Sequence, residues 1–146
     1  MKTKQISALN VLNEAYHYDK PSGFSRGMKV DMGNTSMLFI SGTASIDENG
    51  KTLHRDSFVL QTWRAFANVK ALLESEGATW KDVVKTTIYI KDIEENYDDF
   101  NRIRIDFFKS VGIEVYPASV CVQATLCRSE LLIEMDALAI VKNEII

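Results

Sequence analysis

The segment NVKALLESEGATWKDVVKTTIYIKD, residues 68–92, contains the end of an amphipathic helix and the whole of a strand. In and before it, apolar residues recur near the helical period, at Val59, Trp63, Phe66, Ala67, Val69 and Leu73. Gly77 suits the left-handed turn that ends many helices. Residues 83–90 are rich in β-branched and aromatic residues, which predicts a central strand with Val84, Thr86, Ile88 and Ile90 on one face.

Upstream of this helix, the chain predicts a hairpin. Residues 25–46 contain two short apolar runs separated by GNTS, whose glycine and asparagine suit a tight turn. A second reversal is expected at DENGK, and either Asp56 or Ser57 is placed to cap the helix. The first 20 residues add at most an edge strand.

Downstream, a second helix is predicted within 93–112 and ends at Gly112. Its expected buried side consists of Ile93, Tyr97, Phe100, either Ile103 or Arg104, Phe107 and Val111. Two apolar strands follow, near 118–127 and 131–142, joined by a tight turn around RSE. The order of elements predicts an α+β fold, with two helices packed on one face of a sheet.

The strand 118–127 has two different sides. One carries Val120, Val122, Ala124 and Leu126, which we assign to the core. The other carries Ser119, Cys121, Gln123, Thr125 and Cys127, which we expect to line a cleft. Because two helices cover only one face of the sheet, the other face is left bare, and this predicts a homo-oligomer in which copies of the chain bury it.

Composition narrows the classes of function. The 146 residues predict one domain, 1–146, and the net charge of -3 provides no basic stripe for nucleic acid. No export signal or long apolar run is evident, so we expect a cytoplasmic protein without membrane contact. His17 and His54 are isolated, which predicts no metal site, and Cys121 and Cys127 are too far apart along one strand to form a disulfide.

Four motifs resemble the Rid family, also known as YjgF, perchloric-acid-soluble ribonuclease-like or endoribonuclease L-PSP proteins. They are SGTASIDENGK (41–51), the segment 68–92, YPASVCVQA (116–124) and LLIEMDALAIV (131–141), and the resemblance extends from about Ser22 to Val141. It implies a chorismate-mutase-like fold, in which a six-stranded mixed sheet with two helices on one face forms a trimer with a central barrel. The clefts of such a homotrimer lie between neighbouring subunits.

The resemblance also implies an activity. Better known members hydrolyse reactive enamines and imines, such as 2-aminoacrylate, to a keto acid and ammonia, and they use no cofactor. Cys121 matches the family's pocket cysteine, and Glu134 matches the glutamate that positions water. The chain departs from the pattern twice: Ser119 replaces the arginine that binds the substrate carboxylate, and Phe24 replaces the pocket tyrosine.

A narrower resemblance covers the end of the chain. LCRSELLIEMD, residues 126–136, places Cys127 seven residues before Glu134 and looks like the end of the chorismatase enzymes. Those enzymes are about twice this length, with two Rid-like halves. This resemblance implies, as an alternative, a pocket for a cyclic carboxylic acid.

Hydrolysis of an imine acid requires an acid or base, a held water molecule and an anchor for the carboxylate. Glu134 is the candidate acid and base, because its apolar surroundings would raise its pKa; alternatively it forms an ion pair that holds subunits together. With Ser119 unable to bind a carboxylate, Arg128 or Arg26 is the candidate anchor, with Arg128 preferred, unless both are solvated turn residues.

The remaining candidates form the wall of the pocket. Cys121 and Cys127 are expected to be unreactive buried thiols, with Cys121 also lining the cleft. Phe24 either stacks on the substrate or fills a subunit interface. Two functions stay open: a hydrolase acting on small enamine or imine acids, and a binding or chaperone-like protein that holds such acids without turnover. Ribonuclease activity is disfavoured by the acidic composition.

Overall fold

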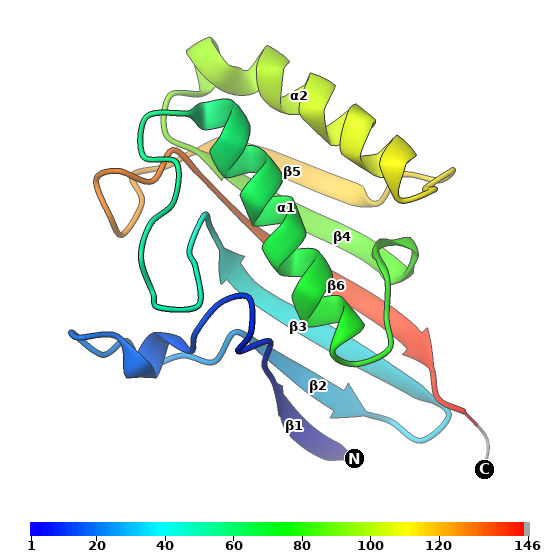
Figure 1. Ribbon diagram of the computed structural model, residues 1–146. Coiled ribbons are helices and arrows are strands. Elements are labelled where there is room, and N and C mark those ends of the chain that lie inside the picture. Colours follow the sequence, from blue (N-terminus) through cyan, green and yellow to red (C-terminus); the bar gives the residue numbers. More distant parts are fainter. Residues whose placement is uncertain (145–146) are drawn as a thin grey trace.

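The computed structural model describes residues 1–144 as one twisted sheet with two long helices on one face (Figure 1). The strands are β1 (Lys2–Ile6), β2 (Gly27–Asp31), β3 (Thr35–Thr43), β4 (Val83–Ile90), β5 (Ala118–Gln123) and β6 (Ile133–Lys142), and the helices are α1 (Phe58–Glu74) and α2 (Ile93–Ser110). Short 3-10 turns lie at Ala15–His17 and Trp80–Asp82.

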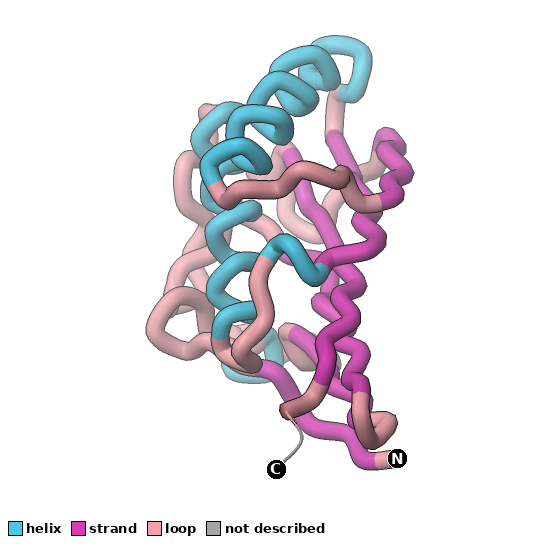
Figure 2. Tube along the Cα trace, turned by 90° about the vertical axis from the view of Figure 1, so that its right-hand side faces the viewer, coloured by secondary structure: helices cyan, strands magenta, loops and turns pink. Residues whose placement is uncertain are grey.

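The strand order is β1-β2-β3-β6-β4-β5, and only the pair β4 and β5 is parallel. The predicted six-stranded mixed sheet, the hairpin and the N-terminal edge strand are therefore confirmed. Figure 2 shows both helices on the same side of the strands. No helix in residues 1–144 has an apolar stretch long enough to cross a bilayer.

Ser57 caps the start of helix α1: its hydroxyl accepts a hydrogen bond from the Leu60 backbone N–H at 3.1 Å. Gly77, at φ 72°, follows the end of the helix. Its apolar buried side chains are Phe58, Ala65, Phe66, Val69, Leu72 and Leu73. The prediction was wrong for Val59 and Ala67, which are exposed. Ala67 is turned about 100° from Phe66 around the helix axis, away from the sheet.

An aromatic cluster joins the two helices to the sheet. Phe66 of α1 stacks on Phe107 of α2 at 4.5 Å between ring centroids, and Trp80 meets both rings edge-on or tilted. In α2 the buried residues are Phe100, Ile103, Phe107 and Phe108. Ile103 thus faces the core, Arg104 turns toward β5, and Tyr97, predicted to be buried, is 39% exposed.

A bulge in β4 changes the face of one predicted core residue. Val83 pairs with Ala139 and Lys85 with Leu138, so Val84 has no partner in the ladder. Val83 is buried and Val84 is exposed, whereas after the bulge Thr86, Ile88 and Ile90 point inward as predicted. Strict alternation had placed Val84 on the inner face, and the inserted residue breaks that alternation.

Strand β5 corrects the prediction in four respects. It ends at Gln123, it is not adjacent to β6, because β4 lies between them, and residues 124–132 form a loop. Its two sides are also reversed. Ser119, Cys121 and Gln123 pair with the inward-facing residues of β4 and face the helices, whereas Val120 and Val122 are 46% and 39% exposed.

The sheet face opposite the helices is bare, as predicted. Its exposed apolar side chains include Met28, Phe39, Val120, Val122 and Ile140, which come from four strands. Glu134 and Asp136 lie on this same face, because they alternate with the buried Ile133, Met135 and Ala137 of β6. The homo-oligomer stays a prediction, and this face is the surface available for it.

Candidate functional site

Glu134 lies on the bare face of β6, beside an irregularity of the sheet. The register of β3 against β6 shifts between Ile40 and Thr43, and Gly42 lies in that shift. A Cβ atom on Gly42 would lie 2.7 Å from Oε1 of Glu134. The missing side chain of Gly42 therefore provides the space that the carboxyl group occupies.

The surroundings of Glu134 favour its protonated form. Burial raises the pKa of the Glu134 carboxyl, and the negative charge of Asp136 raises it further. The positive charge of Arg26 opposes this and lowers the same pKa. A raised pKa brings the carboxyl group closer to the pH at which it can both donate and accept a proton, and general acid–base catalysis by a single residue requires both.

A cleft of about 730 Å³ contains Glu134 and four of the predicted site residues: Phe24, Arg26, Cys127 and Arg128. Three segments far apart in sequence form it: residues 17–26, 42–55 and 127–134. Figure 1 shows the corresponding loops gathered on the left of the view, where β3 ends and β6 begins.

Arg26 is a buried cation, 2% exposed, so it is no solvated turn residue. Its Nε donates to the Asn13 carbonyl at 2.8 Å, and its Nη2 donates to the Tyr18 hydroxyl. Its guanidinium carbon also lies 5.6 Å from the centre of the Phe24 ring. Because protein groups hold Arg26 in place, it acts on Glu134 as a fixed charge.

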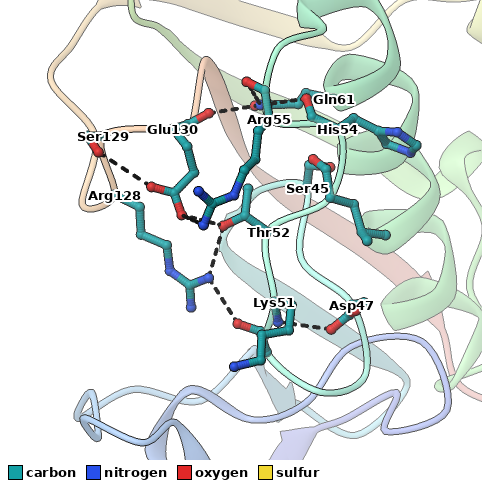
Figure 3. Close-up of polar contacts among 12 residues, drawn as sticks. Ser45, Asp47, Lys51, Thr52, His54, Arg55, Gln61, Arg128, Ser129 and Glu130 are labelled. Carbon is teal, nitrogen blue, oxygen red and sulfur yellow. Dashed lines mark hydrogen bonds and ion pairs between the residues drawn. The ribbon is translucent and has the colours of Figure 1, made fainter.

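Arg128 is half-buried and points into the same cleft. Its Nη1 donates to the Gly50 carbonyl at 2.9 Å and to the Thr52 hydroxyl at 3.0 Å (Figure 3). Glu130 also binds Thr52, accepting its hydroxyl at 3.0 Å. The Arg128 guanidinium lies over the Tyr18 ring, with 4.8 Å to the centroid. The Nε and Nη2 of Arg128 have no hydrogen bond to any described residue.

Ser119 and Cys121 lie away from Glu134, on β5 and on the helix-facing side of the sheet. Burial raises the pKa of the Cys121 thiol, although the charge of Arg104 opposes this effect. Both cysteines are free, and Cys127 is exposed, which corrects the expectation that it is buried. A single chain therefore does not bring Ser119 and Cys121 together with Glu134.

A smaller pocket of about 290 Å³ adjoins Ser119. Its lining residues are Thr86, Asn101, Arg104, Ile105, Phe108, Tyr116, Pro117 and Ser119. The Ser119 hydroxyl accepts hydrogen bonds from the Thr86 hydroxyl at 3.1 Å and from Nη1 of Arg104 at 3.2 Å. The predicted site residues thus fall into two groups, one around Glu134 and one around Ser119.

Sequence analysis missed three residues of these pockets. Gly42 and Tyr18 were not singled out, and Arg104 was considered only as a residue of a helix face. The signal for Arg104 was the choice between Ile103 and Arg104: if Ile103 packs in the core, its neighbour turns about 100° toward the edge of the helix. No sequence signal places Tyr18 between Arg26 and Arg128.

In residues 1–144, no group of three or more His, Cys, Asp or Glu side chains is arranged to hold a metal ion.

Comparison with known proteins identifies the family to which the chain is similar. The family model described as endoribonuclease L-PSP matches residues 19–141. A RutC family protein of Pyrococcus abyssi is 36% identical over 121 residues, which are 82% of this chain and 88% of that protein. The 3-aminoacrylate deaminase RutC of Acinetobacter baylyi is 29% identical over 104 residues, covering 71% of this chain and 79% of the relative.

A solved structure shows the same fold. The crystal structure of the yjgF gene product of E. coli superposes with a TM-score of 0.75 at 27% sequence identity. The match covers 93% of this chain and 97% of that chain. The likeness therefore extends over most of the chain.

Proposed function

Since the chain belongs to the endoribonuclease L-PSP family, also named Rid, YjgF or RutC, we propose that it hydrolyses reactive enamine and imine forms of small 2-keto acids. The observation that supports this most strongly is Glu134, a half-buried carboxyl group with a raised pKa in a cleft of about 730 Å³. A relative whose name gives it an activity of this class, 3-aminoacrylate deamination, supports the same reaction type.

In the proposed reaction, Glu134 first acts as an acid. Its carboxyl proton passes to the carbon of the enamine, which becomes an iminium ion. The Glu134 carboxylate then takes a proton from a water molecule as the water oxygen bonds to the iminium carbon. Glu134 then gives this proton to the nitrogen of the amino alcohol, the C–N bond breaks, and ammonia leaves. The hydroxyl proton returns to Glu134 as the keto group of the 2-keto acid forms. Every step uses one residue that alternates between its two protonation states.

We further propose that the working site lies between copies of the chain in a homotrimer. The bare sheet face supports this, because Glu134 lies on it among exposed apolar side chains. Ser119 and Cys121 lie on β5, which is an edge strand. In a trimer, β5 of one copy can therefore lie beside the cleft that contains Glu134 of another copy. Arg128 adds a positive charge to that cleft, and its Nε and Nη2 have no hydrogen bond to any described residue.

The experiment is ammonia release from 2-aminoacrylate generated in the assay. The wild-type protein should accelerate release over buffer, and E134Q should lose about 100-fold or more of that activity, because the amide cannot exchange the proton. The control is E74Q on α1, an exposed carboxylate paired with Lys70 at 2.8 Å. Wild-type protein that releases ammonia no faster than buffer overturns the proposal.

A second candidate function is binding without turnover. It is favoured by Ser119, which cannot bind a carboxylate as an arginine does, and by Arg26, whose Nε and Nη2 are occupied by protein groups. In that case small keto acids, or a cyclic carboxylic acid, should raise the melting temperature while ammonia release stays at the buffer rate. Loss of a measured turnover in E134Q excludes this candidate.

A further inference from the structure

We propose that Arg104, on α2, is the residue that binds the substrate carboxylate. It lies next to position 119 of β5, where this chain has a serine and no cationic side chain. This inference rests on the proposed function, since it names the anchor of the same shared site. It requires a second copy of the chain, because Arg104 and Glu134 lie in separate pockets of one chain.

The Arg104 guanidinium is held in a fixed orientation. Nη1 donates to the Ser119 hydroxyl at 3.2 Å, Nη2 donates to the Asn101 side-chain oxygen at 2.6 Å, and the guanidinium carbon lies 4.8 Å from the centre of the Phe100 ring. An arginine has five N–H donors, and these contacts use two of them. The remaining donors of a planar, oriented fork are suited to the two oxygens of a carboxylate.

Arg104 also has an uncompensated charge. The ion pairs of the described chain include Arg55 with Glu130 and Arg102 with Asp99, but none that involves Arg104. Its side chain is only half exposed, and it faces the pocket of about 290 Å³. A partly desolvated cation without a carboxylate partner is the feature that an anionic ligand completes.

The other walls of this pocket fit a small keto acid. The hydroxyls of Thr86 and Ser119 meet there at 3.1 Å, while Ile105, Phe108 and Pro117 provide apolar surface. A short 2-keto acid has the same two parts, a charged carboxylate and a small apolar chain. The ligand class that we infer is therefore a monocarboxylate with a short side chain.

The side chains of Ser119 and Arg104 lie in contact and together fill one part of the pocket. Because the Ser119 hydroxyl is within hydrogen-bond distance of Nη1, a longer side chain at 119 would enter the volume that the Arg104 guanidinium fills. The pocket thus admits one guanidinium, which reaches it either from the strand or from the helix. In this chain it comes from the helix.

The test is the binding of 2-oxobutyrate, an unreactive product-like acid, by calorimetry, beside ammonia release from 2-aminoacrylate. R104Q should bind 2-oxobutyrate about 30-fold more weakly or worse, because a partly buried charge pair is lost. The double variant R104Q/S119R should recover most of the binding, since its guanidinium enters the same pocket from β5. R102Q, which removes an exposed arginine two residues away that pairs with Asp99, should bind as the wild type does.

Three results overturn the assignment: R104Q that binds within twofold of the wild type, a double variant that recovers nothing, or R128Q that alone accounts for the loss. If R104Q does not fold, R104K serves in its place, with binding expected to be about 10-fold weaker because an ammonium makes a looser contact. Failure of the proposed function would give a different combination of binding and activity. In that case the wild type binds 2-oxobutyrate through Arg104 but releases no ammonia.

Discussion

At the scale of single residues, the site depends on a carboxyl group and the glycine beside it. Burial raises the pKa of Glu134, and Gly42 leaves room for its oxygen where β3 and β6 shift register. Glycine is required there for close approach, not for an unusual backbone angle. The nearest atoms to the absent Cβ all belong to the mobile end of the Glu134 side chain, which can move without disturbing the fold.

We therefore predict that G42A loses activity with little loss of stability. The added methyl group should push the Glu134 carboxyl out of place and reduce ammonia release about 10-fold or more, as small displacements of catalytic groups do. The urea midpoint should change little. G23A is the matched control, because a Cβ at Gly23 meets nothing within 4 Å. A large loss of stability together with full specific activity would contradict this account.

A second prediction at this scale concerns pH. The folded chain holds the Glu134 proton more tightly than the unfolded chain, so ionisation of Glu134 destabilises the fold as pH rises through its raised pKa. E134Q should accordingly be more stable than the wild type at pH 8, and this advantage should shrink as pH falls from the raised pKa to the ordinary glutamate pKa, below which it is lost. Urea unfolding of both proteins at pH 4 and pH 8 measures the difference. An advantage that is equal at both pH values contradicts the prediction.

At the scale of elements, α2 performs two tasks on adjacent faces. Phe107 and Ile103 fix the helix on the sheet, and this fixes the direction in which Arg104 leaves the helix toward Ser119. On the sheet, the parallel register of β5 with β4 sets which side of β5 faces that arginine. The second pocket therefore exists only where the helix and the edge strand are both in place.

We predict that F107A costs about 3 to 5 kcal/mol of unfolding free energy, since it removes a buried ring that packs against Phe66 and Trp80. Y97A, on the same helix but 39% exposed, should cost well under half of that. Chemical denaturation of both variants measures the ratio. Equal losses would mean that the assigned face of α2 is wrong.

At the scale of the whole molecule, the bare sheet face requires a partner. Apolar side chains of β2, β3, β5 and β6 are exposed on it, next to Glu134. Exposed apolar side chains gathered on one face of a sheet often mark an interface. If copies of the chain meet there, assembly and activity share one surface and should be lost together.

We predict that light scattering shows a trimer of the 16.5 kDa chain, and that F39D converts it to smaller species without turnover. Phe39 is 44% exposed on this face, and an aspartate there would be buried without a partner at the interface. L60D is the control, because Leu60 is exposed to a similar extent, 49%, but lies on α1, on the other side of the sheet. A monomeric wild type with full activity would contradict the shared site.

Local patterns in the sequence predicted both helices, the central strand and a perturbed carboxyl group in the candidate site. Helical periodicity and the glycines at 77 and 112 located both helices. Because two helices can cover only one face of a sheet, the sequence also predicted that the other face is bare. The apolar run around Glu134 marked it as a perturbed carboxyl group, and its raised pKa agrees with that reading. These features depend on neighbours within a few residues, which is the range that a sequence pattern describes.

Only the tertiary structure decided which way the edge strand faces and which cations meet at each pocket. The inner side of β5 follows from its pairing with β4, and the exposure of Val84 follows from a bulge against β6. Likewise, Arg26 and Arg128 reach one cleft from opposite ends of the chain, and Arg104 reaches Ser119 from a different element. The physical reason is that hydrogen-bond register and helix packing join residues far apart in sequence, and local periodicity contains no record of that pairing.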